Sequence, residues 1–195
     1  MVRSRQTVPT TLRTARLLLR PWAATDAARL QPILEANYAH LGPWIPAHVA
    51  TPLPARELAE RLGGFGDDFA ADRAYRYALL TPDGSKVLGE VDLFPRAATG
   101  RVPLRDADHL ELGYWLDAAV TGQGLATEAA GALLAIAATL PGMTHVEIRC
   151  DAANAASAAV PQRLGFHLSA VEAGLQVWRF ELVTNDASSS YAGDP

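Results

Sequence analysis

Lysine and cysteine are almost missing from this chain of 195 residues, which has one lysine, Lys86, and one cysteine, Cys150. A single cysteine forms no internal disulfide and excludes a cysteine-rich metal site. The 17 lysine and arginine residues are outnumbered by 21 acidic residues, giving a formal net charge of −4. The strongly basic surface of a nucleic-acid-binding protein is therefore absent. We expect a cytoplasmic protein with a reduced thiol and no nucleic-acid partner.

Long apolar runs are missing as well. The N-terminal region has one short run, from Leu17 to Leu19, which is too short for the core of a signal peptide. No stretch approaches the ~20 apolar residues of a membrane-spanning helix. Hydrophobic residues make up 49% of the chain and charged residues 19%, as in ordinary soluble domains. We therefore expect one domain with a hydrophobic core and no membrane partner.

Hydrophobic periodicity and turn residues divide the chain into strands and helices. Helices are expected at about 25–38, 54–72, 122–139 and 154–164, and strands at 13–22, 75–80, 86–95, 109–117, 145–150, 165–171 and 175–183. Gly63, Gly64 and Gly66 are predicted to break the second helix, and Asp83-Gly84 to form a hairpin tip. This order predicts one mixed α/β domain at 11–184, between a flexible leader at 1–10 and a disordered tail at 185–195.

The most distinctive stretch is AAVTGQGLATEAAGAL at 118–133, where Gly122 and Gly124 precede an almost entirely apolar helix. Such a turn either lets the chain enter the helix or exposes backbone N–H groups to an anion, usually a phosphate. The strand before it has Gly113 in its middle, and a strand glycine often marks the close approach of a backbone or ligand. The spacings of a dinucleotide fingerprint and of a P-loop are both absent.

A second polar motif follows in CDAANAASAAVPQRLGF at 150–166. Asn154 and Ser157 are three residues apart and share one face at the start of a short helix. Each also has an ordinary structural explanation, Asn154 as a helix N-cap and Ser157 as a first-turn residue. Pro161 lies inside this helix and is expected to kink or shorten it.

Taken in order, these motifs resemble the GCN5-related N-acetyltransferase (GNAT) family, and within it the branch containing the ribosomal-protein N-terminal acetyltransferases. The resemblance covers roughly 12–183 and rests on TARLLLRPW, NYAHLGPWIP, VLGEVDLF, LELGYWLD, GQGLATEA and N-x-x-S followed by LGF. It implies a single α/β domain whose central, mostly antiparallel sheet is splayed at an acyl-CoA site and flanked by helices. It also implies acetyl-CoA as co-substrate.

The resemblance further implies which residues hold acetyl-CoA. The pyrophosphate would rest on N–H groups at the start of the helix, and the pantetheine arm would run along a strand edge toward a serine near the sulfur. The implied cofactor-binding residues are Trp115, Leu116, Gln123, Gly124, Leu125, Ala126, Thr127, Asn154 and Ser157. Two positions depart from the family pattern: Pro161, and Thr121, where the turn commonly begins with arginine or glutamine.

Acetyl transfer needs a neutral amine and a protonated leaving thiolate, so a carboxylate and a hydrogen-bond donor are sought. Glu111 is the candidate general base, because strand alternation places it beside Gly113 and Trp115. Its alternative is an exposed carboxylate, or one paired with Arg101 or Arg105. Ser157 is the candidate donor to the sulfur. Tyr114 and Tyr38 are alternative acids, although Tyr114 falls on the apolar face and fits the core better.

The acceptor pocket is assigned to Trp44, Glu90 and Asp92, and the two carboxylates are also the next candidates for the general base after Glu111. The two carboxylates share one face of the strand at 86–95, and Trp44 fits a pocket wall or a core anchor equally well. Cys150 alternates with apolar strand residues and reads as a buried thiol. The five histidines, His40, His48, His109, His145 and His167, show no ligand spacing, so no metal is expected.

The identity of the acceptor is left open by the sequence. The resemblance favours a protein N-terminal α-amine, as in a ribosomal protein, attacked directly in a ternary complex. The alternative is a small-molecule amine or an antibiotic. An alternative of a different class is a CoA-binding module without transfer activity. A homodimer is expected from the resemblance alone.

Overall fold

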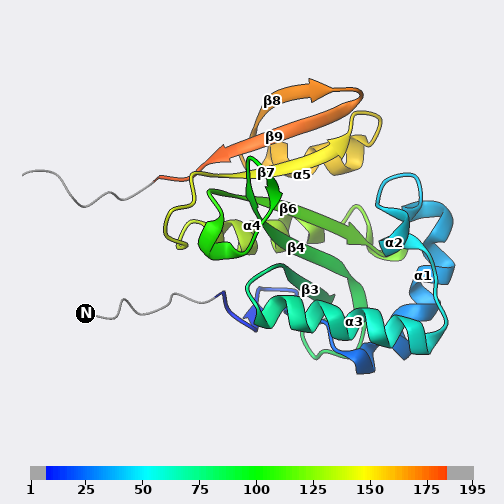
Figure 1. Ribbon diagram of the computed structural model, residues 1–195. Coiled ribbons are helices and arrows are strands. Elements are labelled where there is room, and N and C mark those ends of the chain that lie inside the picture. Colours follow the sequence, from blue (N-terminus) through cyan, green and yellow to red (C-terminus); the bar gives the residue numbers. More distant parts are fainter. Residues whose placement is uncertain (1–7, 184–195) are drawn as a thin grey trace, which may run out of the picture.

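One nine-stranded sheet runs through the molecule, and every neighbouring pair is antiparallel except β6 and β7 (Figure 1). The computed structural model describes residues 8–183. The predicted tail at 185–195 and most of the predicted leader at 1–10 therefore lie outside the described residues. The strand order is β1-β2-β3-β4-β6-β7-β9-β8, with β5 paired to the end of β4. The strands are β1 (Leu12–Arg13), β2 (Leu18–Pro21), β3 (Tyr75–Leu80), β4 (Val87–Ala97), β5 (Gly100–Arg101), β6 (His109–Leu116), β7 (His145–Asp151), β8 (His167–Glu172) and β9 (Leu175–Glu181).

Helices cover both faces of the sheet (Figure 1). The helices are α1 (Ala27–Leu41), α2 (Ala47–Ala50), α3 (Ala55–Ala70), α4 (Leu125–Ala137) and α5 (Ala155–Arg163). On one face, α1 and α3 bury Leu34, Leu58 and Leu62 against a cluster that includes Trp115 of β6. On the other face, α4 and α5 pack behind β4, β6 and β7. The predicted mixed α/β domain with a mostly antiparallel sheet is confirmed.

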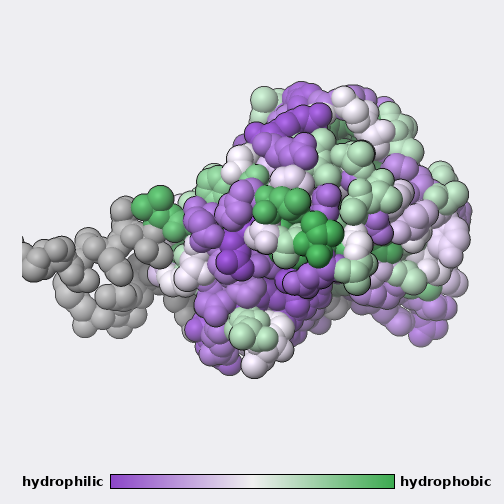
Figure 2. All heavy atoms as spheres, turned by 90° about the horizontal axis from the view of Figure 1, so that it is seen from above, coloured by the Kyte–Doolittle hydropathy of each residue, from purple (hydrophilic) through white to green (hydrophobic). Residues whose placement is uncertain are grey.

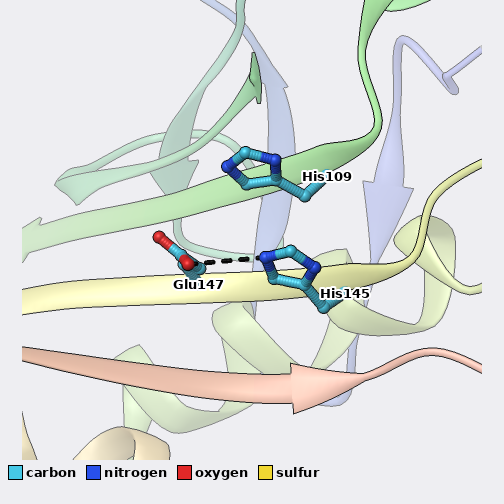
Figure 3. A group of neighbouring side chains, drawn as sticks. All are labelled: His109, His145 and Glu147. Carbon is cyan, nitrogen blue, oxygen red and sulfur yellow. Dashed lines mark ion pairs between the residues drawn. The ribbon is translucent and has the colours of Figure 1, made fainter. Parts of the chain in front are cut away.

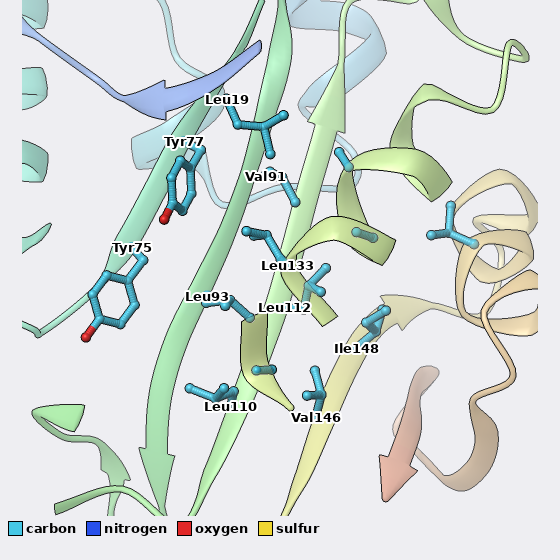
Figure 4. Packing of buried hydrophobic residues seen from close by; sticks show 14 of the residues in the cluster. Leu19, Tyr75, Tyr77, Val91, Leu93, Leu110, Leu112, Leu133, Val146 and Ile148 are labelled. Atoms are coloured by element: carbon cyan, nitrogen blue, oxygen red, sulfur yellow. The ribbon is translucent and has the colours of Figure 1, made fainter. Parts of the chain in front are cut away.

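The larger core lies between α4 and the sheet (Figure 4). Leu133 of α4 is fully buried there among side chains from several strands, including Val91, Leu112 and Ile148. The short side chains Ala129, Ala130 and Ala137 are also fully buried and let the helix approach the strands closely. Burial of a large aliphatic side chain contributes about 2–3 kcal/mol. The nearly apolar sequence of α4 is thus explained by its burial.

The hairpin between β3 and β4 is confirmed. All six residues of β3 and the first nine of β4 are buried. Asp83 stabilises the turn because its Oδ1 accepts hydrogen bonds from Thr81 Oγ1 (2.5 Å) and from Ser85 N (3.1 Å). Gly84 has φ +73°, a conformation that glycine adopts without strain. Lys86, next to this turn, is exposed.

The prediction that glycines break the second helix is wrong. Helix α3 continues without interruption through Gly63, Gly64 and Gly66 to Ala70. A glycine in a helix costs about 1 kcal/mol relative to alanine. This cost is offset by tertiary packing, because Leu58, Leu62 and Phe69 of the same helix are buried.

Two further local predictions need correction. The expected first strand at 13–22 is two short antiparallel strands, β1 and β2, joined by a turn in which Thr14 N donates to the carbonyl of Leu17 (3.0 Å). Helix α5 runs through Pro161 to Arg163, so the proline does not shorten it. Pro161 is buried in this helix, and tertiary packing again outweighs local propensity.

The face above β8 and β9 is mainly hydrophilic, with a small group of strongly hydrophobic residues (Figure 2). The β8–β9 hairpin exposes three large apolar side chains, Leu168, Val171 and Leu175. Among the described residues, no helix has both the length and the apolar character needed to cross a bilayer.

Candidate functional site

The candidate site lies where the two parallel strands separate. Within residues 8–183, β6 and β7 are paired only at Leu110 opposite Val146 and at Glu111 opposite Glu147. Both strands run on beyond this short ladder, and a cleft of about 1050 Å³ opens between them. Its walls come from β4, β6, β7, α2, α4 and α5. The splayed sheet expected from the sequence is present.

The glycine-rich turn forms one end of the cleft. Gly124 is the N-cap of α4 and has φ +78°, and Gly122 has φ +74°. No side chain caps α4 within the described residues. The first N–H groups of a helix have no partner inside the helix, and here Leu125 and Ala126, which carry two of them, line the cleft. Together with the helix dipole, these groups form an environment that favours an anion.

Arg16, in the loop between β1 and β2, binds this turn through its side chain. Its Nη1 donates to the carbonyl of Gln123 (2.8 Å), and its Nε is 2.7 Å from Oε2 of Glu128 in the first turn of α4. Its Nη2 is 3.7 Å from the place that a Cβ on Gly124 would occupy. A guanidinium group therefore lies beside the glycine turn, although Thr121 offers no cation there.

Besides Asp92 Oδ1 and Arg76 Nε on the carboxylate side, two polar side-chain atoms near α4 and β6 line the cleft and are buried without a hydrogen-bond partner in the described part of the chain. They are Thr127 Oγ1, in the first turn of α4, and Trp115 Nε1, on β6. Leaving a buried donor unsatisfied costs roughly 1–3 kcal/mol. A ligand that carries acceptor atoms along this wall would remove that cost, so the wall fits an acyl-CoA.

The second polar motif also lines the cleft. Asn154 is the N-cap of α5, and its Oδ1 accepts a hydrogen bond from Ser157 N (3.0 Å). Asn154 is thus a helix N-cap, as one of the two interpretations predicted. It also lines the cleft, so a ligand bound there can contact it. Ser157 Oγ is 3.3 Å from the hydroxyl oxygen of Tyr114. Two hydroxyl groups therefore lie together at this side of the cleft.

Tyr114 has a structural role that sequence analysis missed. Its hydroxyl donates to the backbone carbonyl of Ser157 (2.8 Å). In a regular helix this carbonyl would accept from the residue four positions later, which is Pro161 and has no N–H. Burial raises the pKa of Tyr114 above its ordinary value, so the phenol is a neutral O–H donor at neutral pH.

The candidate base Glu111 is held in an ion pair. Its Oε2 is 2.5 Å from Arg96 Nη2 and 3.9 Å from Arg149 Nε. The partners considered from the sequence, Arg101 and Arg105, do not form this pair. Arg101 instead lies over the ring of Phe94. Oε2 of Glu111 is therefore already engaged by a guanidinium group.

Glu90 is the most enclosed carboxylate of the cleft wall. It is 2% exposed, and both oxygens are engaged, Oε1 by Arg76 Nη2 (2.6 Å) and Oε2 by Trp22 Nε1 (2.5 Å). A buried charge is tolerated when it is paired and hydrogen-bonded in this way. Glu90 therefore shapes the electrostatics of the cleft, and each of its oxygens already accepts a hydrogen bond.

Asp92 differs from both of these carboxylates. It is 6% exposed, and its Oδ1 is buried with no hydrogen-bond partner among residues 8–183. Burial raises the pKa of Asp92 to about 7; the charge of Arg76 opposes this shift, and those of Glu90 and Glu111 add to it. Asp92 is thus a carboxylate in a cleft wall that exchanges a proton near neutral pH, a property typical of functional groups.

One part of the cleft is lined by the segment around α2. Trp44 lines the cleft and is 42% exposed, so it is a wall residue and not a core anchor. At the opposite wall, Cys150 is buried, and burial raises the pKa of its thiol. A thiol of this kind is a poor nucleophile, in agreement with its interpretation as a structural residue.

The residues predicted to bind acetyl-CoA or the acceptor come together in this one cleft. Gln123 is the exception, because it does not line the cleft and its carbonyl is held by Arg16. The lining residues from that prediction are Trp44, Glu90, Asp92, Glu111, Trp115, Leu116, Gly124, Leu125, Ala126, Thr127, Asn154 and Ser157. Their roles in binding and catalysis remain predictions.

The sequence model of the acetyltransferase (GNAT) domain matches residues 16–167. This match includes the glycine turn, the splayed strands and α5. No curated protein matches the chain at a significant level.

Several solved structures share the fold. RimL, described as a ribosomal L7/L12 alpha-N-protein acetyltransferase in complex with coenzyme A, has a TM-score of 0.73 at 20% identity, over 90% of this chain and 97% of that chain. The microcin C7 self-immunity acetyltransferase MccE, in complex with acetyl-CoA and AMP, has a TM-score of 0.74 at 17% identity, over 92% and 100%. Mycobacterium smegmatis RimJ with CoA-disulfide has a TM-score of 0.69 at 22% identity, over 85% and 81%.

Proposed function

Because the chain belongs to the GNAT acetyltransferase family and is an acetyl-CoA-dependent N-acetyltransferase, we propose that its acceptor is a protein N-terminal α-amine of the ribosomal-protein type. The observation that carries this proposal is the carboxylate wall of the cleft, where Asp92 lacks a hydrogen-bonded cation among the described residues. The named activity of RimL, a protein of the same fold, supports a protein α-amine as the acceptor.

The fit to acetyl-CoA rests on residues at three places in the cleft. The uncapped start of α4, with Gly122 and Gly124, suits a pyrophosphate. Thr127 Oγ1 and Trp115 Nε1 have no hydrogen-bond partner among the described residues. They suit hydrogen bonds to acceptor atoms along the pantetheine arm. When bound, acetyl-CoA supplies the activated acetyl thioester.

We assign proton acceptance to Asp92. An α-amine has an ordinary pKa near 8, so it is mostly protonated at neutral pH and must lose a proton before it attacks. A base with a pKa of about 7 is well matched to this task. Glu111 was the first candidate from the sequence, but its Oε2 is engaged by Arg96, whereas Oδ1 of Asp92, one of the next candidates, has no hydrogen-bond partner among the described residues.

The leaving thiolate needs a hydrogen-bond donor on the opposite side of the cleft. Ser157 and Tyr114 place two hydroxyl oxygens 3.3 Å apart there. The Tyr114 proton is directed to the Ser157 carbonyl, and Ser157 Oγ–H donates to the Tyr114 oxygen over a longer 3.3 Å, so Ser157 Oγ–H is the donor that would turn toward the sulfur. The amine proton thus passes to Asp92, while the Ser157 hydroxyl hydrogen-bonds the thiolate sulfur that leaves.

The test is mass spectrometry of acetyl transfer from acetyl-CoA. We expect a gain of one acetyl group on peptides beginning with serine, alanine or methionine, and none on the same peptides with a blocked α-amine but a free lysine. Acetylation of only a small-molecule amine in the same panel would replace the protein acceptor with a metabolic or antibiotic acceptor. Binding of acetyl-CoA without transfer to any amine would indicate a CoA-binding module.

A further inference from the structure

The orientation of one peptide group decides whether the glycine-rich turn can bind an anion. This group joins Gln123 to Gly124, the N-cap of α4. No peptide bond among the described residues is cis, and in a trans peptide the C=O and the N–H point in opposite directions. The group that binds the carbonyl of Gln123 therefore determines where the N–H of Gly124 points.

The local sequence leaves this orientation open. Glycine adopts positive and negative φ with similar ease, so Gly124, which has φ +78°, would accept the reversed peptide group as well. Gly122, with φ +74°, gives the preceding part of the turn the same freedom. A contact from outside the turn is needed to select one orientation.

Arg16 makes this contact. Its Nη1 donates to the carbonyl of Gln123 (2.8 Å), on the side of the turn away from the cleft, since Gly124 lines the cleft whereas Arg16 and Gln123 do not. The N–H of Gly124 is thereby directed away from Arg16 and toward the cleft. No backbone carbonyl of the described chain accepts a hydrogen bond from this N–H, so it is available to a ligand.

Arg16 is itself held in place by Glu128, in the first turn of α4. Its Nε donates to Oε2 of Glu128 (2.7 Å), and its backbone N–H donates to Oε1 (2.9 Å). Thr14 Oγ1 donates to the same Oε1 (2.5 Å). Three hydrogen bonds thus fix the loop between β1 and β2 on α4 and aim the guanidinium group at the turn.

The same contact offsets a charge that would oppose an anion. Glu128 lines the cleft close to the start of α4. Burial would raise the pKa of Glu128, but the hydrogen bonds from Thr14 and Arg16 outweigh it and lower the pKa, so the group is ionised at neutral pH. Without its guanidinium partner, this carboxylate would repel a phosphate bound beside it.

We propose that Arg16 is a positioning residue for acetyl-CoA, which turns the N–H of Gly124 toward the pyrophosphate and neutralises Glu128. This role rests on the proposed function, in which the pyrophosphate binds at the start of α4. Thr121, at the beginning of the turn, carries no charge. The cation at this turn comes instead from a loop 107 residues away in the sequence.

The test is calorimetric titration of the full-length protein with CoA, which needs no acceptor. Arg16→Ala should weaken CoA binding about tenfold or more, the loss expected when one hydrogen bond to a charged group is removed. Arg13→Ala is the matched control, because Nη1 of Arg13 also donates to a backbone carbonyl, that of Pro82 (2.9 Å), and neither residue lines the cleft. This control should bind CoA like the unchanged protein.

Kinetics with acetyl-CoA separate positioning from a general loss of structure. Arg16→Ala should raise the KM for acetyl-CoA and leave kcat nearly unchanged, because the reacting thioester would lie near Asp92 and Ser157, away from the turn. Arg16→Lys keeps a positive charge beside Glu128 but lacks the planar fork that reaches two partners at once. It should weaken CoA binding by a smaller factor than Arg16→Ala.

Equal CoA affinity in Arg16→Ala and in the unchanged protein would overturn the proposal, as would an equal loss of affinity in Arg13→Ala. If Arg16→Ala does not fold, Arg16→Lys decides, and unchanged affinity in that variant would overturn the proposal. Failure of the unchanged protein to bind CoA would contradict both this role and the proposed function. CoA binding that depends on Arg16, without acetylation of any peptide, would support this role and contradict only the proposed acceptor.

Discussion

The carboxylate of Asp92 lies against the backbone of Gly113 on the neighbouring strand. A Cβ atom at position 113 would be only 2.4 Å from Oδ1 of Asp92, a separation that side chains do not tolerate. The strand glycine noted in the sequence therefore makes room for a side chain of the same protein. Gly113→Ala should displace the Asp92 carboxylate from its buried position.

Asp92→Asn tests the assignment of the base. We expect kcat to fall by about 100-fold or more at neutral pH, within the range of general base catalysis, while the dissociation constant for acetyl-CoA stays unchanged. In the unchanged enzyme, kcat/KM should rise with pH through about 7 as Asp92 loses its proton. This limb should be absent from the pH profile of the variant.

Glu111→Gln is the comparison that distinguishes the two candidate bases. If Asp92 is the base, Glu111→Gln should lower turnover modestly and keep the limb near pH 7. Loss of that limb in Glu111→Gln, with the limb retained in Asp92→Asn, would return the role to Glu111. In both variants, acetyl-CoA binding measured by calorimetry serves as the control for folding.

Asp92→Asn should also change stability, in the opposite direction to activity. The folded-state pKa of Asp92 is about 7, whereas an unfolded aspartate has a pKa near 3.9. Between these values the unfolded chain releases a proton that the folded chain retains, so stability falls as pH rises from about 4 to 7. Above pH 7 the cost is on the order of 4 kcal/mol. The melting temperature of Asp92→Asn should exceed that of the unchanged protein by more at pH 8 than at pH 5.

Gly124→Val tests the anion-binding turn. Both Gly124 and Gly142 have φ near +80° and no backbone atom close to a Cβ at that position, so valine at either position brings similar strain, of roughly 1–2 kcal/mol or more. Only Gly124 lines the cleft. We expect Gly124→Val to weaken acetyl-CoA binding at least tenfold, and Gly142→Val to lower the melting temperature alone. Equal affinities in calorimetry would contradict the turn assignment.

Tyr114→Phe tests the link between Tyr114 and α5. The variant leaves the carbonyl of Ser157 without its donor, so we expect a loss of about 1–2 kcal/mol in the free energy of unfolding. Pro161→Ala supplies the missing N–H, and in that background Tyr114→Phe should cost less. A double-mutant cycle by denaturant unfolding measures this coupling. Additive effects of the two substitutions would show that the Tyr114 hydroxyl does not replace the missing N–H of residue 161 at the Ser157 carbonyl.

Local patterns predicted most of the fold. The alternation in β6 and the apolar composition of α4 were sufficient to place the central strand and its helix, because both periodicities follow from the backbone itself. The glycines of α3 were misjudged, since the packing of Leu58 and Leu62 overrides local propensity. Local sequence carries no information about that packing.

The contacts that determine chemistry were harder to predict. Arg16 reaches Glu128 across 112 residues of sequence, and no periodicity signals such a pair. His109 and His145 are 36 positions apart and stack on each other because β6 and β7 are parallel neighbours (Figure 3). Likewise, the difference between Asp92 and Glu111 depends on which carboxylate an arginine reaches, which only the folded chain decides.

The short ladder between β6 and β7 has a consequence for amide hydrogen exchange. Beyond Glu111, the edge of β6 that faces the cleft has no β7 partner within the described residues, while its other edge is paired with β4 up to Leu116. Amides of β6 beyond Glu111 that face the cleft should therefore exchange rapidly in the free protein and become protected when a ligand fills the gap. Hydrogen exchange at these amides thus reports whether a ligand occupies the cleft, without a label and without turnover.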